Sequence, residues 1–204
     1  MRPARTLDEQ AEATAAMMAH FANFTGKLSH GVYKMPANHF DLAWSADKAG
    51  AMRNQVYVMG RVDLGPGEAF VVDVNDGGAE YFTVPLSNIW GTTLDLVDRT
   101  GSLNKAQSVA NDDGTYTHVI SPVDPGGANW IDSDGLAEAI LTLRMAEFGE
   151  SGPRAGLGAR GRVIELDDLD REVPHLPRVT APQRATELAR RRAAYLRRLP
   201  EGTS

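Results

Sequence analysis

The sequence contains no cysteine. A disulfide framework, a thiol nucleophile and a thiolate metal site are therefore excluded, and the fold must be stabilised by packing and polar contacts. No run reaches the roughly 18 consecutive apolar residues that a bilayer span requires, and the N-terminus lacks the apolar centre of a secretory signal. We therefore expect a cytoplasmic protein with no membrane partner.

Motifs of the common cofactor sites are also missing. The histidines show no His-Glu-x-x-His spacing, no serine lies in a Gly-x-Ser-x-Gly elbow, and no glycine cluster stands between a strand and a helix, where phosphate binds. The segment from Asp73 to Gly77 opens like a calcium loop, but Val84 occupies the position of the bidentate glutamate. The sequence predicts no metal and no other cofactor.

Charge is unevenly distributed along this chain of 204 residues, whose net charge is -6. Residues 180–198 hold six arginines and one acid, Glu187. Without basic patches elsewhere, this segment favours a surface helix docked on an acidic body, with the acidic run 165–172 as a partner surface, over a nucleic-acid site. We expect no nucleic-acid partner.

The first 54 residues differ from the rest in pattern. Apolar residues recur at helical spacing from residue 7 to 24, which predicts an amphipathic helix. Residues 25–54 carry turn formers and scattered aromatics, which predicts an extended arm. Its aromatic side chains, on Tyr33, Phe40 and Trp44, need a surface to cover, and a second copy of the chain would supply one. We therefore expect a homo-oligomer.

The rest of the chain alternates with a period of two and is interrupted by turn residues, which predicts strands and hairpins. Residues 136–148 fit a helix or a strand, and 181–198 fit a helix with Pro182 in its first turn. Short strands at this spacing favour a sandwich, barrel or jelly roll. The predicted strands are 56–62, 69–74, 81–86, 90–97, 107–110, 116–120 and 161–166.

Several elements together resemble one bacterial protein family. They occur in order over about residues 55–148, and the strand Val163 to Leu166 continues the likeness. The matching elements are Tyr81-Phe82, Pro85 to Trp90, Leu94-Asp95, Arg99, Ser102 to Asn104, Gln107, Asp113-Gly114, Asp124 to Gly126, Asn129 to Asp132 and Arg144. The chain resembles the C-terminal module of the family catalogued as domain of unknown function 1214.

The resemblance implies a fold and no activity. It implies a mainly β, jelly-roll-like antiparallel sandwich and makes 140–145 a strand with an arginine near its end. Together with the helical patterns it gives three parts: an N-terminal helix and arm (1–54), the jelly-roll domain (55–166), and a loop with an arginine-rich helix (167–204).

One face of the predicted strands combines rings with titratable groups. If the strands are extended, Tyr57, Arg61, Tyr81, Tyr116 and His118 share a face opposite the apolar core. Such a face suits a small-molecule groove, a protein interface or a plain solvated surface. His118 is the candidate general base, because imidazole titrates near neutral pH, and a structural role is the alternative.

The polar stretch from Asp124 to Asp132 is the second candidate site. Asp132 is its candidate acid or base, and Arg144 would orient an anionic substrate or pair with Asp132. Turn capping and a plugging Trp130 are the structural alternative. The candidate ligand-binding residues are Tyr57, Arg61, Tyr81, Asn104, Tyr116, Asn129, Trp130 and Arg144.

These observations leave two classes of function open. The leading one is a small-molecule-binding jelly roll that acts as a metal-independent hydrolase or lyase. The alternative is a non-catalytic interaction module that oligomerises, or pairs with a partner, through its N-terminal arm.

Overall fold

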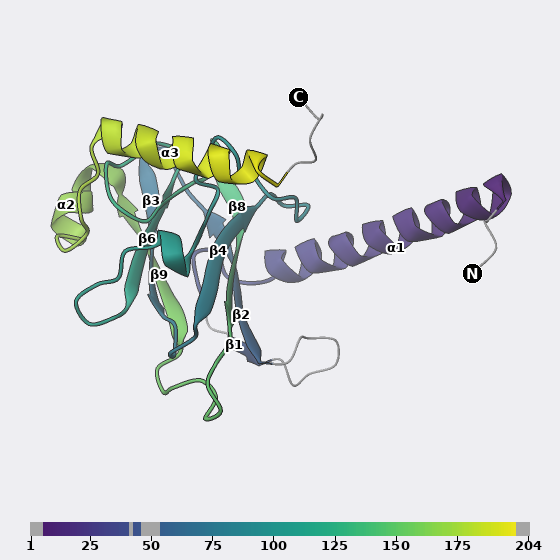
Figure 1. Ribbon diagram of the computed structural model, residues 1–204, viewed down its shortest axis with the longest axis horizontal. Helices are drawn as coiled ribbons and strands as arrows, with labels where there is room; N and C mark the ends of the chain where they lie inside the picture. The colour runs from purple at the N-terminus through teal and green to yellow at the C-terminus, as the bar shows by residue number, and fades with distance from the viewer. Residues whose placement is uncertain (1–5, 41–42, 46–53, 199–204) are drawn as a thin grey trace.

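The computed structural model describes residues 6–40, 43–45 and 54–198. Their strands form two sheets, one five-stranded in the order β1-β2-β8-β4-β5 and one four-stranded in the order β7-β6-β3-β9. A long helix precedes the sheets and another follows them (Figure 1). The prediction of a mainly β, jelly-roll-like sandwich with helices at both ends is confirmed.

The five-stranded sheet has one inner and one outer face. It contains β1 (Ala43–Ser45), β2 (Gln55–Asp63), β4 (Tyr81–Ser87), β5 (Ser102–Asn104) and β8 (Glu138–Ala146). Buried and half-buried residues alternate strictly along β2, as the valines at its even positions predict. The strand expected at 140–145 is present as β8, which lies between β2 and β4.

The four-stranded sheet is buried more completely. It contains β3 (Glu68–Asn75), β6 (Tyr116–Ser121), β7 (Trp130–Asp132) and β9 (Gly158–Glu165). All six residues of β6 are buried. Its outer face is covered by Leu169, Val173 and Leu176, from the short helix α2 (Leu169–Glu172) and the segment after it. The sequence of a strand with both faces covered does not alternate regularly between apolar and polar residues.

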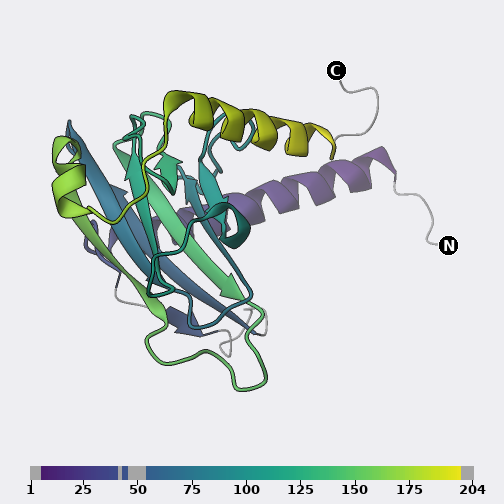
Figure 2. The same ribbon diagram turned by 60° about the vertical axis from the view of Figure 1, so that its left-hand side comes forward.

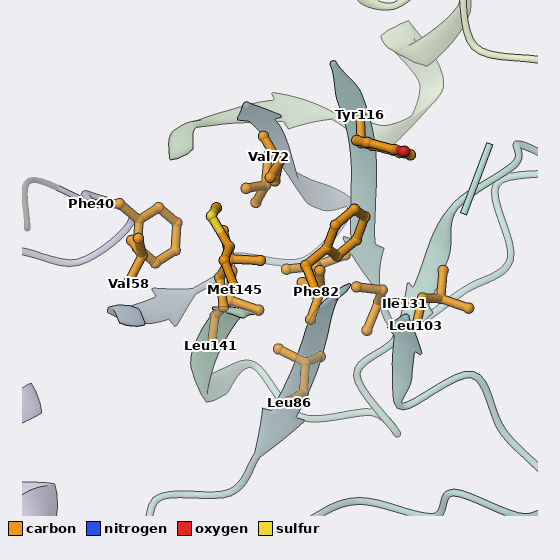
Figure 3. Packing of buried hydrophobic residues seen from close by; sticks show 14 of the residues in the cluster. Phe40, Val58, Val72, Phe82, Leu86, Leu103, Tyr116, Ile131, Leu141 and Met145 are labelled. Atoms are coloured by element: carbon orange, nitrogen blue, oxygen red, sulfur yellow. The ribbon is translucent and has the colours of Figure 1, made fainter. Parts of the chain in front are cut away.

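The main core lies between the two sheets (Figure 3). Phe82, Leu86 and Met145 from the five-stranded sheet face Val72 and Ile131 from the four-stranded one. All five are less than 1% exposed. Removing apolar surface from water contributes about 25 cal/mol per Å² to the free energy of folding, so the burial of this layer is the main source of stability.

The N-terminal helix is longer than the sequence predicted. Helix α1 runs over Leu7–Tyr33, and Thr6 and Glu9 form a capping box at its start. The segment from residue 25 to 33, expected in the extended arm, is therefore helical. Gly26 and Gly31 weaken the helical pattern there. The helix projects away from the sandwich in both views (Figures 1 and 2).

The end of the N-terminal segment packs into the sandwich. Phe40 is 8% exposed, belongs to the core, and its ring lies 5.3 Å from that of Phe70. Its ring occupies the space above Gly60, where an added Cβ would lie 2.0 Å from Phe40 Cε1. Phe40 is thus covered by its own chain and needs no second copy, contrary to expectation. Tyr33 is 36% exposed, and the side chain of Trp44 lies outside the described residues.

The arginine-rich helix α3 (Ala181–Leu196) lies on the body of the protein, as predicted. Buried Arg184 binds Asp124 at 2.9 Å and the carbonyl oxygen of Gly127 at 2.6 Å, and Arg191 Nε donates to the carbonyl oxygen of Leu96. The partner surface is wrongly predicted, however. Acids of the run 165–172 pair with Arg171 and Arg178, which lie outside α3.

Three short segments correct the strand predictions. Residues 90–97 form turns around Gly91 instead of a strand, and Lys105–Gln107 is a 3-10 helix instead of the first half of a hairpin. Within the expected loop 121–135, Trp130–Asp132 forms β7, which pairs parallel to β6. Across the described ranges, no helix combines the length and apolarity needed to cross a bilayer.

Candidate functional site

The predicted aromatic face is divided between the two sheets. Tyr57 and Tyr81 lie on the five-stranded sheet, whereas Tyr116 and His118 lie on β6 of the four-stranded one. Tyr116 and His118 point inward, and their rings meet Phe82 edge-on at 4.7 Å and 6.0 Å between centroids. The prediction that they share an outward face with Tyr81 is therefore wrong. The outer face of β6 is also buried, so apolar Val119 points outward while Tyr116 and His118 point into the core. This is the reverse of the orientation that the sequence pattern predicts.

His118 is a core residue. Its side chain is 0% exposed, its Nε2 atom lies 3.1 Å from Ser108 Oγ, and its Nδ1 atom has no hydrogen-bond partner. Burial lowers the pKa of His118 to about 4, and only the charge of Asp73 opposes this shift. The imidazole is neutral near pH 7 and closed to a substrate, so the structure argues against its predicted role as general base.

The outer face of the five-stranded sheet keeps four of the predicted residues. The Arg144 guanidinium lies 5.6 Å over the Tyr57 ring, and both side chains bind Gln55 Oε1, at 2.8 Å and 2.6 Å. Arg61 lies over the Tyr33 ring instead, and Tyr81 is 43% exposed. Tyr57 and Arg144 form a compact polar group, and Arg61 belongs to another cluster.

The second predicted cluster has structural partners. Asp132 is 5% exposed and pairs with Arg99 at 2.9 Å, so the expected pairing with Arg144 is wrong. Asn129 holds the backbone of Val109 through both its amide nitrogen and its oxygen. These bonds fix loops and occupy the polar atoms that a ligand would need.

Asn104 and Trp130 also have structural partners. Asn104 forms a capping box with Gln107 at the 3-10 helix. Trp130 Nε1 donates to Ser121, and Arg184 covers its ring at 5.1 Å.

A different row of polar side chains crosses the outer face of the four-stranded sheet. Thr117 on β6 pairs in register with Asp73 on β3, which pairs with Arg160 on β9. His175 reaches this row from the segment after α2, which buried Val173 and Leu176 fasten to the sheet. Side chains at paired positions share a face, so four elements place these groups together.

Hydrogen bonds fix the geometry of this row. Thr117 Oγ1 donates to Asp73 Oδ1 at 2.8 Å, accepts from Asn111 Nδ2 at 3.0 Å, and lies 3.2 Å from His175 Nε2. A hydroxyl has one hydrogen, and Asp73 receives it, so His175 Nε2 must carry the proton that it shares with Thr117. In the neutral form of the imidazole, this assignment leaves His175 Nδ1 as an acceptor.

The carboxylates of this region accept hydrogen bonds from other residues of the fold, whereas one arginine forms no ion pair. Asp73 Oδ2 accepts from Arg162 at 2.6 Å. Asp113 Oδ1 accepts from the hydroxyl and the amide of Thr115, and these bonds lower the pKa of Asp113. Arg160 is exposed and forms no ion pair with any described residue.

The row borders a hollow of about 780 Å³, in the size range of small-ligand sites. Phe40, Val58 and Leu157 form an apolar wall, and Asp73, Thr117, Arg160 and His175 are among the polar lining. No group of three or more histidines or acids in the described ranges could hold a metal ion.

The sequence held weak signals for this hollow. Asp73 interrupts a run of valines in a buried strand, and a polar residue at such a position calls for a partner. The partner lies 44 positions along the chain at Thr117, and His175 was considered only for metal spacing. Their meeting depends on the pairing of β3 with β6, which no local pattern reveals.

Comparison with known proteins adds to the fold and gives no activity. The sequence matches no protein-family model and no curated protein. An uncharacterised protein from Burkholderia cenocepacia is similar over 73% of this chain, with 28% identity and a TM-score of 0.58. A protein from Vibrio parahaemolyticus is similar over 78%, with 13% identity and a TM-score of 0.45. This chain spans 39% and 38% of their respective lengths.

Proposed function

We propose that this protein binds a small hydroxylated organic anion in the hollow beside Asp73, Thr117 and His175. The observation that supports this is the charge of Arg160, which forms no ion pair with any described residue, while Asp73 and Asp113 are bonded within the fold. A ligand carboxylate would supply the missing partner through charge-assisted hydrogen bonds.

The rest of the lining favours a ligand that also carries hydroxyl groups. Asn75, Asn111 and Thr115 offer amide and hydroxyl groups along the hollow, and such groups both donate and accept hydrogen bonds. The wall formed by Phe40 and Leu157 can cover the carbon skeleton. Small hydroxycarboxylates combine these three properties.

Arg160→Gln is expected to weaken the binding of such an anion by roughly 10- to 100-fold, because a charge-assisted hydrogen bond contributes about 1.5–3 kcal/mol. Lactate, malate and tartrate are suitable probes, titrated against the labelled protein by NMR chemical-shift perturbation. Glycerol, which has no charge, should bind both proteins equally.

Arg154→Gln is the matched control, since Arg154 is an exposed arginine beside Gly78 that does not line the hollow. It should leave the titration unchanged. If none of the anions shifts resonances of the hollow, or if both variants bind as the parent does, the proposal is wrong.

The hydrolase or lyase form of the proposal assigns proton transfer to His175. Thr117 is 0% exposed, so its hydroxyl orients the imidazole and cannot attack a substrate. His175 is exposed and keeps an acceptor nitrogen. Proton NMR after long incubation tests this role. A probe anion that binds and stays chemically unchanged would show that the protein binds it without catalysis.

The membership of the chain in the family called domain of unknown function 1214 stays a prediction, as does its cytoplasmic location. The absence of nucleic-acid and membrane partners has the same standing.

A further inference from the structure

Helix α1 carries a row of exposed apolar side chains. Leu7 is 82% exposed, Met17, Met18 and Phe21 are each 66% exposed, and Phe24 is 57% exposed. At about 100° per residue they fall within an arc of about 120°, which places them along one side of the helix. We call these five residues the α1 stripe. A contiguous apolar patch of this kind is uncommon on a monomer and marks an interaction surface.

The body of the protein does not cover the α1 stripe. Contacts with the sandwich are made at the C-terminal end of the helix, where Val32 is buried and Tyr33 Oη donates to Glu138 Oε2 at 2.5 Å. From there α1 leads away from the sandwich (Figures 1 and 2). A helix of 27 residues is about 40 Å long, so most of the stripe lies beyond reach of its own chain.

We propose that α1 pairs in antiparallel orientation with the α1 helix of a second copy of this chain. Side-chain size along the helix supports this orientation. Small residues, among them Ala11 and Ala15, fill the first half, and the phenylalanines Phe21 and Phe24 lie in the second. Antiparallel pairing places the rings of each helix against the small residues of the other, as close packing requires.

Charge supports the same orientation. The acids of α1, Asp8, Glu9 and Glu12, lie in its first half, and its one lysine, Lys27, lies in the second. An antiparallel pair places the acidic first half of each helix beside the half of the other helix that carries Lys27, whereas a parallel pair would place acids beside acids.

A membrane surface fits α1 less well than a second copy does. Helices that lie in the bilayer interface carry many lysines and arginines on the polar face. From Leu7 to Tyr33 the sequence has three acids, one lysine and no arginine. A second copy offers both the apolar cover and the complementary charge.

The first test is the oligomeric state of the whole chain by sedimentation equilibrium, with the double variant Phe21→Ala/Phe24→Ala. Each dimer loses four rings, so its dissociation constant should rise roughly 100-fold or more. Alanine favours helix more than phenylalanine does, so intrinsic helix propensity is retained. The control is Asn23→Ala, two residues from Phe21 and off the stripe, which should leave the dimer intact.

Single cysteines test the orientation cleanly, because the chain has none of its own. Placing Phe21 against Ala15 of the other copy centres the dimer on residue 18, so Met18→Cys should give a disulfide-linked dimer under mild oxidation, since its Cα atoms approach within about 7 Å. Leu7→Cys, near one end, should remain unlinked. Asn23→Cys, off the stripe, controls for random collision.

Each result has one meaning for the proposal. A dimer that dissociates with the phenylalanine variant and cross-links only through Met18→Cys supports it. A monomer at all concentrations, a dimer that ignores the variant, or efficient cross-linking through Leu7→Cys overturns it. Binding of the parent chain to anionic lipid vesicles in place of dimerisation would likewise overturn it and identify a membrane helix.

Discussion

His118→Ala is expected to lower the free energy of unfolding by about 2–4 kcal/mol, because it empties a space between the sheets as a core truncation does. The ring is 0% exposed and packs edge-on to Phe82, and its loss leaves Ser108 Oγ without its imidazole partner. Urea unfolding followed by tryptophan fluorescence measures the loss. Tyr81→Ala is the control: Tyr81 is 43% exposed on the other sheet, so its loss should cost less than about 1 kcal/mol.

The pKa of His118 gives this prediction a pH dependence. The folded pKa of about 4 lies below the ordinary histidine pKa of 6.5, so the unfolded chain takes up the proton first. The stabilisation is therefore complete above pH 6.5 and is lost as the pH falls toward 4, by about 3 kcal/mol at most. A His118→Gln variant should lack this loss. An unchanged slope in the variant would show that another group titrates.

Arg184→Ala is expected to destabilise the protein by about 2–3 kcal/mol and to loosen α3. Arg184 is 5% exposed, binds Asp124 and Glu187, and covers the ring of Trp130. Truncation leaves the carbonyl of Gly127 and the carboxylate of Asp124 without this donor. We expect less than the full cost of breaking a buried pair, since the Asp124 side chain is 33% exposed. Hydrogen exchange of α3 amides would report the loosening.

Arg192→Ala provides the comparison on the same helix. Arg192 pairs with Asp98, but both side chains are 54% exposed, and exposed pairs contribute little. Its removal should leave the free energy of unfolding nearly unchanged. Equal effects of the two substitutions would mean that Arg184 does not anchor the helix.

Local sequence patterns predicted most strands and not their partners. Along β2 and β4 one face is half-exposed, so alternation identifies the core residues correctly. Along β6 both faces are buried, so alternation of apolar and polar residues cannot distinguish the inner face from the outer one. His118 therefore looked like a surface residue, although its ring lies in the core.

The candidate site could not be predicted for the same reason. Asp73, Thr117 and His175 lie far apart in sequence and meet because β3 pairs with β6 and because α2 anchors the segment that carries His175. Asn129 and Asp132 were conspicuous in the sequence because turns require such residues. Their side chains hold loops in place.

The ring of Phe40 above Gly60 fixes where the chain divides into separable parts. Phe40 itself is built into the sandwich, because removal of its ring would open a gap against Phe70. The seam between helix and sandwich therefore lies after Tyr33 and before Phe40. A chain cut at this seam would lose α1, and with it the proposed pairing, while keeping the β-domain and its hollow.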